Sequence, residues 1–309
     1  ILAAVGLPRA ALPDLAPPGR PVGVLSSAAA RATGLPAGLP LVTGAGDHQC
    51  AGLGAGAIAP GLVEITLGTS AVALTAAPRF MPDPRQRLMC CAHGFPGAWN
   101  LEGLQNAVGS ALGWGRRLLN RSTVPGARIW GEVEAVPAGS GGLRFLPYLA
   151  GSSAPHWDPQ ATGSLLGVTL QSEAAAVLRA LLEGLSFELR AILDLFDAHG
   201  APVREIRVTG GLAGVVTWNR ILAGILARPL HRMAEPHATL LGAALLAAVG
   251  AGVYPSVNEA VRAMVHVRTI VEPPRNWVDA YTALRFDFND CDARVRASGL
   301  YRSGGRMKG

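Results

Sequence analysis

The sequence predicts an α/β protein in which helices cover a layered sheet. Three observations lead to this class. Short β-type runs alternate with segments of helical periodicity, 39 Gly and 23 Pro are spread between them as turn residues, and half of the residues are hydrophobic. At 309 residues the chain is long enough for one large domain or two ordinary ones. Disorder is excluded, because burial of so much apolar surface offsets the entropy lost on folding.

The first predicted unit is a strand, a tight turn and a helix. The apolar run Leu41–Thr43 ends in a Gly-Ala-Gly turn, and Asp47 opens a small-residue stretch that extends to Ala57. This Asp has two interpretations: a helix N-cap, which local sequence alone favours, or a general base that accepts a proton from an attacking hydroxyl. His48 beside it is suited to hydrogen-bond a polyol, although a lone His is more often structural.

The elements that follow alternate in type. The clearest helix is Glu173–His199, whose apolar residues recur at spacings of three and four, with Ser172 as its expected N-cap and Gly200 as the glycine that ends it. The other expected elements are a hairpin of strands 62–67 and 71–75, a helix within 101–119, strands over 143–149 and 205–208, and helices over 215–226, 240–249, 257–264 and 280–295.

Composition and charge exclude several classes of protein. No apolar run is long enough to span a membrane. Cys50, Cys90, Cys91 and Cys291 lack disulfide or metal-ligand spacing, so we expect a cytoplasmic protein and no metal ligands. The net charge of +6 comes from dispersed Arg, which argues against a nucleic-acid partner. The single Lys, Lys308, excludes a G-x-x-x-x-G-K-[ST] phosphate loop. A homodimer is left open.

Three glycine-bearing turns stand where predicted strands end. They lie before Asp47, at Gly68-Thr69 and at Gly210-Gly211. Glycine lets backbone N–H groups approach an anion, so the three together indicate phosphate handling, although each alone is also an ordinary turn. The patterns G-x-G-x-x-G, G-x-S-x-G and H-E-x-x-H are absent, which disfavours a nicotinamide enzyme, an α/β hydrolase and a zinc protease.

Six segments, taken in order, resemble the FGGY carbohydrate kinases of the actin-like ATPase superfamily. Their order and spacing over most of the chain argue against a chance match. They read LVTGAGDHQCAGLGAGA (41–57), VEITLGTSAVAL (63–74), FLPYLAGSSAPHWDPQATGSLLGVTL (145–170), LRALLEGLSFELR (178–190), IRVTGGLAGVVTWNRILAGILARP (206–229) and LLGAALLAAVGAGVYP (240–255).

The resemblance implies a ribonuclease H-like fold that forms the C-terminal half of a two-domain sugar kinase, with ATP and Mg²⁺ bound between the domains. We therefore expect residues 1–57 to be the end of an N-terminal sugar-binding domain. Residues 58–265 would be the ATP-binding domain, and residues 266–309 a C-terminal helix and basic tail. The family's first phosphate loop, an Asp-Gly-Thr-rich hairpin, has no counterpart here. We expect a fragment that is inactive by itself.

The resemblance also implies roles for single residues. It reverses the preference at Asp47, which falls on the family's general base, and leaves His48 as a further substrate contact. Gly68 and Thr69 match the second phosphate turn, Gly109 matches a nucleotide-contact glycine, and Gly210 and Gly211 match the turn that holds the adenosine.

Two functions stay open on this basis. The first is ATP-dependent phosphorylation of a small sugar or polyol, closest to the xylulose kinases. The second is a pseudokinase that binds nucleotide or sugar in a regulatory role, because the residues after Gly211 depart from the usual adenosine turn and Gly224 replaces a commonly acidic position.

Overall fold

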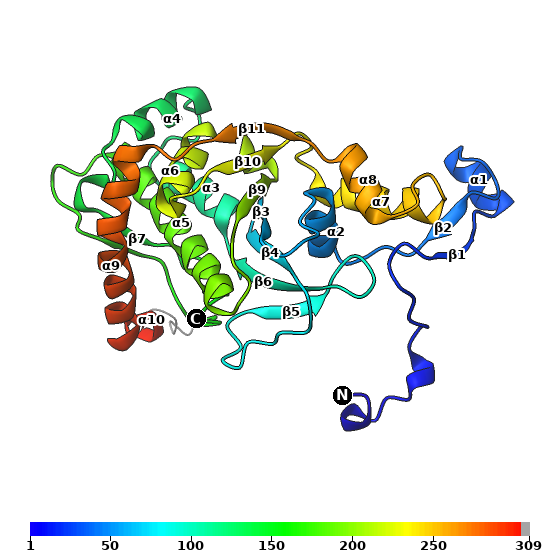
Figure 1. The fold of residues 1–309 in the computed structure, drawn as a ribbon. Coiled ribbons are helices and arrows are strands. Elements are labelled where there is room, and N and C mark those ends of the chain that lie inside the picture. Colours follow the sequence, from blue (N-terminus) through cyan, green and yellow to red (C-terminus); the bar gives the residue numbers. More distant parts are fainter. Residues whose placement is uncertain (304–309) are drawn as a thin grey trace.

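The computed structural model describes residues 1–303, and a seven-stranded mixed sheet lies at its centre (Figure 1). The pairs β10–β9 and β9–β3 are parallel, and the other pairs are antiparallel. In order across the sheet, the strands are β11 (Val267–Val271), β10 (Leu230–Met233), β9 (Glu205–Thr209), β3 (Leu62–Leu67), β4 (Ala71–Ala77), β6 (Trp99–Gln105) and β5 (Met89–Ala92).

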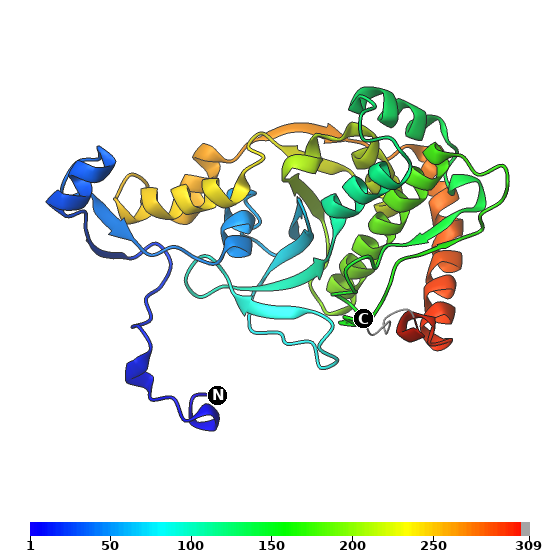
Figure 2. The same ribbon diagram turned by 180° about the vertical axis from the view of Figure 1, so that it is seen from behind.

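Helices lie on both sides of this sheet (Figures 1 and 2). Because side chains alternate along a strand, Val63, Ile65 and Leu67 of β3 enter the larger core, whereas Glu64 and Thr66 face the opposite side. The longer helices that contribute to the larger core are α3 (Val108–Leu118), α4 (Gly126–Ala135), α5 (Ala174–Ala198), α6 (Val216–Leu226) and α9 (Arg275–Ala297). A second, smaller core joins α2 (Asp47–Gly54), α7 (Ala238–Gly250) and α8 (Val257–Met264).

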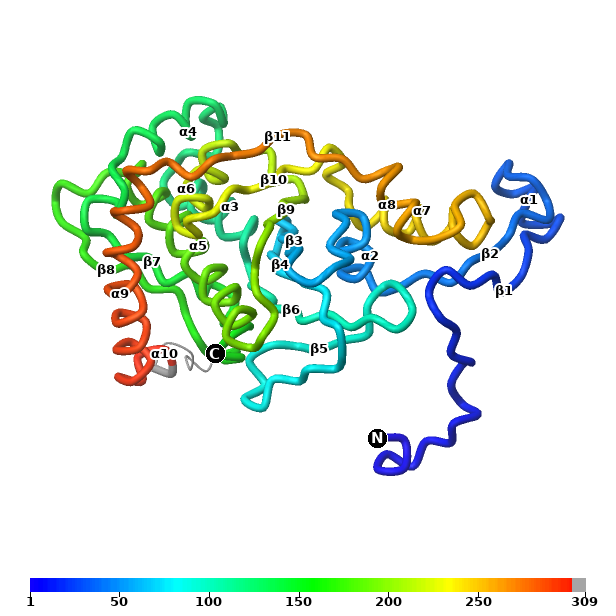
Figure 3. Tube along the Cα trace, in the orientation of Figure 1, coloured from blue at the N-terminus to red at the C-terminus, as the bar shows by residue number. Residues whose placement is uncertain are grey.

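The N-terminal segment extends away from this body (Figure 3). Its strands β1 (Pro21–Val24) and β2 (Pro40–Val42) pair only with each other and enclose α1 (Ser27–Thr33). The remaining elements are the small pair β7 (Arg144–Leu146) and β8 (Ser164–Leu166), the short α10 (Leu300–Ser303), and the 3-10 turns Ala3–Val5, Arg9–Ala11, Ser140–Gly142 and Gly211–Gly214. The predicted division of the chain at residue 57 stays a prediction. None of the helices within residues 1–303 has the length and hydropathy to cross a membrane.

Most predicted elements are confirmed, and two details are wrong. The segment 101–119, expected to be helical from its start, is helical only from Val108. Its first part belongs to strand β6, which pairs with β4 and β5, and a left-handed residue at Ala107 (φ 56°) separates this strand from α3. Ser172 does not cap α5: its Oγ accepts from the N–H of Thr169 at 3.0 Å, and Glu173 takes the N-cap position. Gly200 ends that helix with φ 82°, as predicted.

Candidate active site

Two of the predicted glycine turns lie side by side at the carboxyl ends of the parallel strands β3 and β9. In the β3–β4 hairpin the pairing of Leu67 with Ala71 leaves Gly68, Thr69 and Ser70 as the turn. Gly210 follows β9 with φ 84°, and a Cβ there would overlap the carbonyl oxygen of Leu67. The second turn therefore packs directly on the strand that carries the first, which requires glycine at position 210.

Gly109 joins these turns from a third element. It stands in the first turn of α3, and its N–H donates to the carbonyl oxygens of Gly68 and Thr69, both at 3.0 Å. A Cβ on Gly109 would lie 2.7 Å from the oxygen of Gly68 and 3.3 Å from the side chain of Leu212. The structure thus brings Gly68, Thr69, Gly109 and the Gly210-Gly211 turn together, although they are spread over more than a hundred residues of sequence.

Two backbone donors at these turns are free. Within residues 1–303, the N–H groups of Thr69 and Gly211 donate to no protein acceptor, and both residues are exposed. Unpaired amides beside glycine turns are the donors that bind phosphate oxygens. The residues present therefore fit a phosphate-bearing group.

Asp47 begins α2, with Gly46 in the N-cap position. The alternative in which Asp47 caps the helix is therefore wrong. The flexible side chain of Gln49 folds back over Gly46, so a residue with a Cβ at this position would have to displace only that amide group. The carboxylate of Asp47 is exposed, and its Oδ1 accepts from the backbone N–H of His48 at 3.0 Å. It is free to meet a group that approaches from solvent.

His48 links this helix to the central sheet. Its Nδ1 lies 2.6 Å from Oε1 of Glu102 on β6, whose side chain is only 2% exposed. The pKa of His48 is raised above its usual value, mainly by the hydrogen bond to Glu102 and against the effect of burial. The sequence prediction missed Glu102. A charged residue inside an apolar strand was its only signal, and that segment was expected to be a helix.

A second buried carboxylate ties the ends of β3 and β9 together. Glu64 is fully buried, and its Oε1 accepts from the hydroxyls of Thr66 and Thr209, both at 2.6 Å. Its Oε2 has no partner in the described part of the chain, and burial raises its pKa to about 7. Because Thr66 and Thr209 precede the two glycine turns, Glu64 fixes the spacing between them.

Small residues and one Arg hold α2 in place. Gly54 of α2 and Gly242 of α7 let the two backbones touch, since a Cβ on either would overlap a carbonyl group of the other helix. At the far end of α2, the guanidinium of Arg207 donates to the carbonyl oxygens of Ala55 at 2.8 Å and Gly56 at 3.1 Å. Those are helix C-terminal acceptors that a cation stabilises.

Replacing Gly242 with Ala is expected to lower the free energy of unfolding by about 1–3 kcal/mol, because the added methyl group must push α7 away from the Cys50 carbonyl. Gly131→Ala is the matched control. Gly131 is also helical, but nothing lies within 4 Å of its Cβ position, so this change is expected to stabilise by about 0.5–1 kcal/mol. Urea denaturation of both variants tests this; equal effects would contradict the close approach of α2 and α7.

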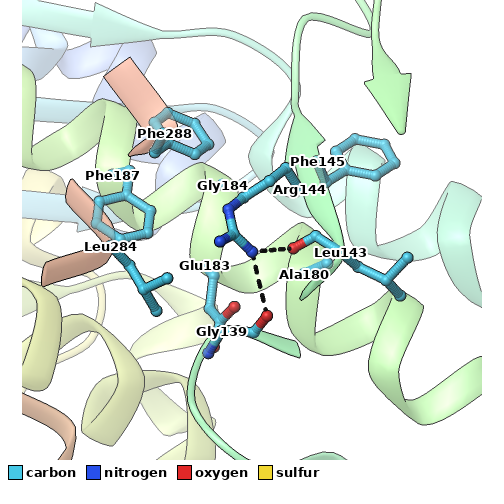
Figure 4. A pocket seen from close by; sticks show the side chains of 10 residues that line it. All are labelled: Gly139, Leu143, Arg144, Phe145, Ala180, Glu183, Gly184, Phe187, Leu284 and Phe288. Atoms are coloured by element: carbon cyan, nitrogen blue, oxygen red, sulfur yellow. Dashed lines mark hydrogen bonds between the residues drawn. The ribbon is translucent and has the colours of Figure 1, made fainter. Parts of the chain in front are cut away.

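A small, partly open pocket that none of the glycine turns of the site lines is found between α5 and α9 (Figure 4). Its volume is about 10 Å³, which holds no more than one water. Arg144 at its edge donates to the carbonyl oxygens of Leu143 at 3.0 Å and Gly139 at 3.3 Å. This pocket is too small for a substrate. A surface hollow is instead lined by Glu235, His237 and Leu240. It adjoins the glycine turns, because the carbonyl oxygen of Pro236, the residue between Glu235 and His237, accepts from the N–H of Gly210.

The mixed sheet with helices on both faces and phosphate-type turns at its strand ends defines a protein with the actin-like ATPase fold. Residues 63–251 match the model of the C-terminal domain of the FGGY family of carbohydrate kinases. The chain belongs to this family. It is 30% identical over 263 residues to a xylulose kinase of Bacillus subtilis and 35% identical over 254 residues to a glycerol kinase of Geobacter.

Solved structures agree with this assignment. The chain superimposes on the crystal structure of xylulose kinase from Rhodospirillum rubrum with a TM-score of 0.85 and 32% identity, which covers 97% of this chain and 60% of that one. The match to the Bacillus enzyme covers 85% of this chain and 52% of the enzyme, and the match to the Geobacter enzyme covers 80% and 49%. The chain therefore spans about half the length of these curated relatives.

Proposed function

We propose that the gene product carrying this sequence phosphorylates a hydroxyl of a small sugar or polyol with Mg-ATP, and that its substrate is of the xylulose type. The observation that carries the proposal is the convergence of two glycine turns and the first turn of α3 at the carboxyl ends of β3 and β9, with α2, the helix that begins at Asp47, packed against β3 and β4. The xylulose kinases named above support the choice of a ketose over glycerol.

In this proposal each residue has a stated task. The free N–H of Thr69, with its hydroxyl, binds the phosphoryl group that is transferred, and the Gly210-Gly211 turn holds the nucleoside end, with residues 58–265 as the ATP-binding part of the chain. Asp47 accepts the proton of the attacking hydroxyl. Phosphoryl transfer passes through a loose transition state, so positioning and charge stabilisation supply most of the catalysis.

Mg²⁺ would reach the site with ATP. Among residues 1–303 there is no group of three or more His, Cys, Asp or Glu arranged to hold a metal ion. Mg²⁺ commonly keeps several waters and binds through substrate phosphates with one or two carboxylates. The bound ion would neutralise charge on the phosphates. We also propose that residues 1–309 by themselves do not transfer phosphate from ATP to a sugar.

Calorimetric titration with Mg-ATP tests the nucleotide half of the proposal. Thr69→Ala is expected to weaken binding about tenfold, because it removes a hydrogen bond to a charged group. Thr282→Ala is the matched control, since the Thr282 hydroxyl only donates to a carbonyl on the exposed side of α9. Equal affinity in Thr69→Ala and the unaltered protein would contradict the proposed phosphate contact.

Enzyme assays over pentuloses, glycerol and gluconate test the other half. Phosphorylation of a pentulose with the highest kcat/KM is the expected result. Binding of Mg-ATP with no transfer to any of these acceptors would favour the pseudokinase instead. Failure to bind Mg-ATP would contradict the kinase and leave only a pseudokinase that binds sugar.

A further inference from the structure

We propose that Glu102 is a positioning residue that fixes the imidazole of His48, so that His48 presents its Nε2 to an oxygen of the sugar or polyol beside the hydroxyl that attacks. This inference rests on the proposed function and deepens it, because it assigns substrate contact to a pair of residues from two different elements. Glu102 itself touches no substrate and acts through His48.

The geometry of the pair carries the inference. Glu102 and His48 are 54 residues apart in the chain, yet Oε1 and Nδ1 lie 2.6 Å apart. The carboxylate is 2% exposed, whereas the imidazole is 35% exposed, so one partner is anchored in the sheet and the other reaches the surface beside Asp47. The second carboxylate oxygen of Glu102 accepts a longer hydrogen bond from Nε2 of Gln49, at 3.4 Å. Both oxygens are thus directed at consecutive residues of α2.

The free side of the imidazole is the functional side. With Nδ1 committed to Glu102, the remaining ring nitrogen is Nε2, which forms no hydrogen bond or ion pair with a protein group within residues 1–303. A carboxylate on one ring nitrogen sets the tautomer and orientation of the other, as in sites where His must point in one direction. His48 follows Asp47 directly, so a substrate oxygen at Nε2 belongs to a molecule whose reacting hydroxyl lies at Asp47.

The charges around His48 favour a protonated ring. The acidic groups that act on it are Glu102 on β6, Asp47 on its own helix and Glu64 on β3, and each of them raises its pKa. With Nδ1 donating to Glu102, Nε2 donates to a substrate oxygen when the ring is protonated and accepts from a hydroxyl when the ring is neutral. A sugar hydroxyl, which both donates and accepts, fits Nε2 in either state.

Buried carboxylates are costly unless a cation or hydrogen bonds compensate them. Glu102 has its closest compensation in His48. Two functions are therefore served by one contact: the imidazole neutralises the carboxylate in the sheet, and the carboxylate removes the freedom of the imidazole at the surface. A hydrophobic residue on β6 would serve the sheet equally well but would leave the ring free to rotate.

The first test needs no enzymatic turnover. Nuclear magnetic resonance of the ring nitrogens of the 309-residue chain, with the His48 signals assigned by their loss in His48→Gln, follows titration and tautomer. Glu102→Gln keeps the shape of the side chain and removes its charge. We expect the His48 titration midpoint to move to lower pH and the preference for a protonated Nδ1 in the neutral ring to weaken.

A matched control comes from a second pair of an imidazole and a carboxylate. His156 Nε2 lies 3.4 Å from Oδ2 of Asp292 on α9. Asp292→Asn removes a carboxylate near a different imidazole and is expected to leave the His48 signals unchanged. A His48 titration curve that is the same in Glu102→Gln and in the unaltered chain would overturn the proposal, as would an equal shift in Asp292→Asn.

Kinetics of the gene product test the link to substrate. Glu102→Gln is expected to raise the KM for the sugar about tenfold, with little change in the KM for Mg-ATP. In a His48→Ala background the same change is expected to have no further effect on the sugar KM, because its effect passes through His48. Additive effects would show that Glu102 acts by another route and would overturn the assignment.

The two sets of measurements separate this inference from the function on which it rests. Absence of phosphorylation for every sugar would contradict the proposed function and the substrate contact, while the resonance data would still decide whether Glu102 orients His48. Phosphorylation with an unchanged sugar KM in Glu102→Gln would leave the kinase in place and overturn the inference alone.

Discussion

Replacing Asp47 with Asn is expected to lower kcat for sugar phosphorylation by about 10²–10⁴-fold, the usual contribution of a general base. Asn keeps the size of the side chain and its oxygen acceptor for the N–H of His48, which Asp47 Oδ1 binds at 3.0 Å. It removes the capacity to take a proton. No side chain caps the start of α2, and Asp47 is exposed, so the fold is expected to persist.

The measurement is a steady-state assay of ADP release in the gene product, with Mg-ATP affinity from calorimetry alongside. Affinity for Mg-ATP is expected to stay unchanged, since Asp47 stands on α2 and not on the glycine turns. Asp279→Asn, which alters an exposed carboxylate on α9, is the control and should retain full activity. A kcat near that of the unaltered protein in Asp47→Asn would exclude Asp47 as the base.

Local features of the site could be predicted because they depend on residues that are close together in the sequence. The turn Gly68-Thr69-Ser70 follows from two β-type runs separated by three residues, and its hairpin forms as expected. Helix α5 follows from a long apolar period, and the glycine that ends it follows from the same pattern. These elements are determined by turn chemistry and periodicity, which act over a few residues.

What the sequence did not reveal depends on contacts between distant strands. The leucines of 101–119 fit a helical spacing, but the pairing of β6 with β4 and β5 decides that the first part of this segment is a strand. Glu102 can be recognised as a site residue only from the structure, in which β6 is a strand and places Glu102 against His48 of α2. The role of Glu64 likewise depends on the parallel pairing of β9 with β3, because this pairing brings the hydroxyl of Thr209 to the carboxylate of Glu64.

Glu188→Gln is expected to remove much of the pH dependence of stability on the alkaline side. Glu188 lies on α5 and is fully buried; its Oε2 accepts from Nε2 of Gln105 at 2.7 Å, and burial raises its pKa to about 8. A carboxyl with a raised pKa binds more protons folded than unfolded between about pH 4.5 and 8. The free energy of unfolding therefore falls as pH rises through that window, on the order of 5 kcal/mol in all.

Glutamine at position 188 keeps an acceptor for Gln105 and carries no charge, so the loss of stability assigned to this carboxyl should vanish. Two other buried groups shape the same curve. Glu64, with a pKa of about 7, acts in the same direction, and His93, whose burial lowers its pKa to about 4, acts in the opposite direction below pH 6.5. The difference between the unaltered protein and Glu188→Gln, measured by urea denaturation at each pH, therefore isolates position 188.

The expected difference grows from near zero at pH 5 to its full value above pH 8, with the variant the more stable protein at high pH. Glu272→Gln changes an exposed carboxyl and should follow the unaltered protein throughout. Parallel curves for Glu188→Gln and Glu272→Gln would mean that Glu188 is ionised at little cost. In that case the negative charge of Glu188 must be compensated by the nearby guanidinium of Arg296, whose positive charge opposes part of the rise in pKa that burial causes.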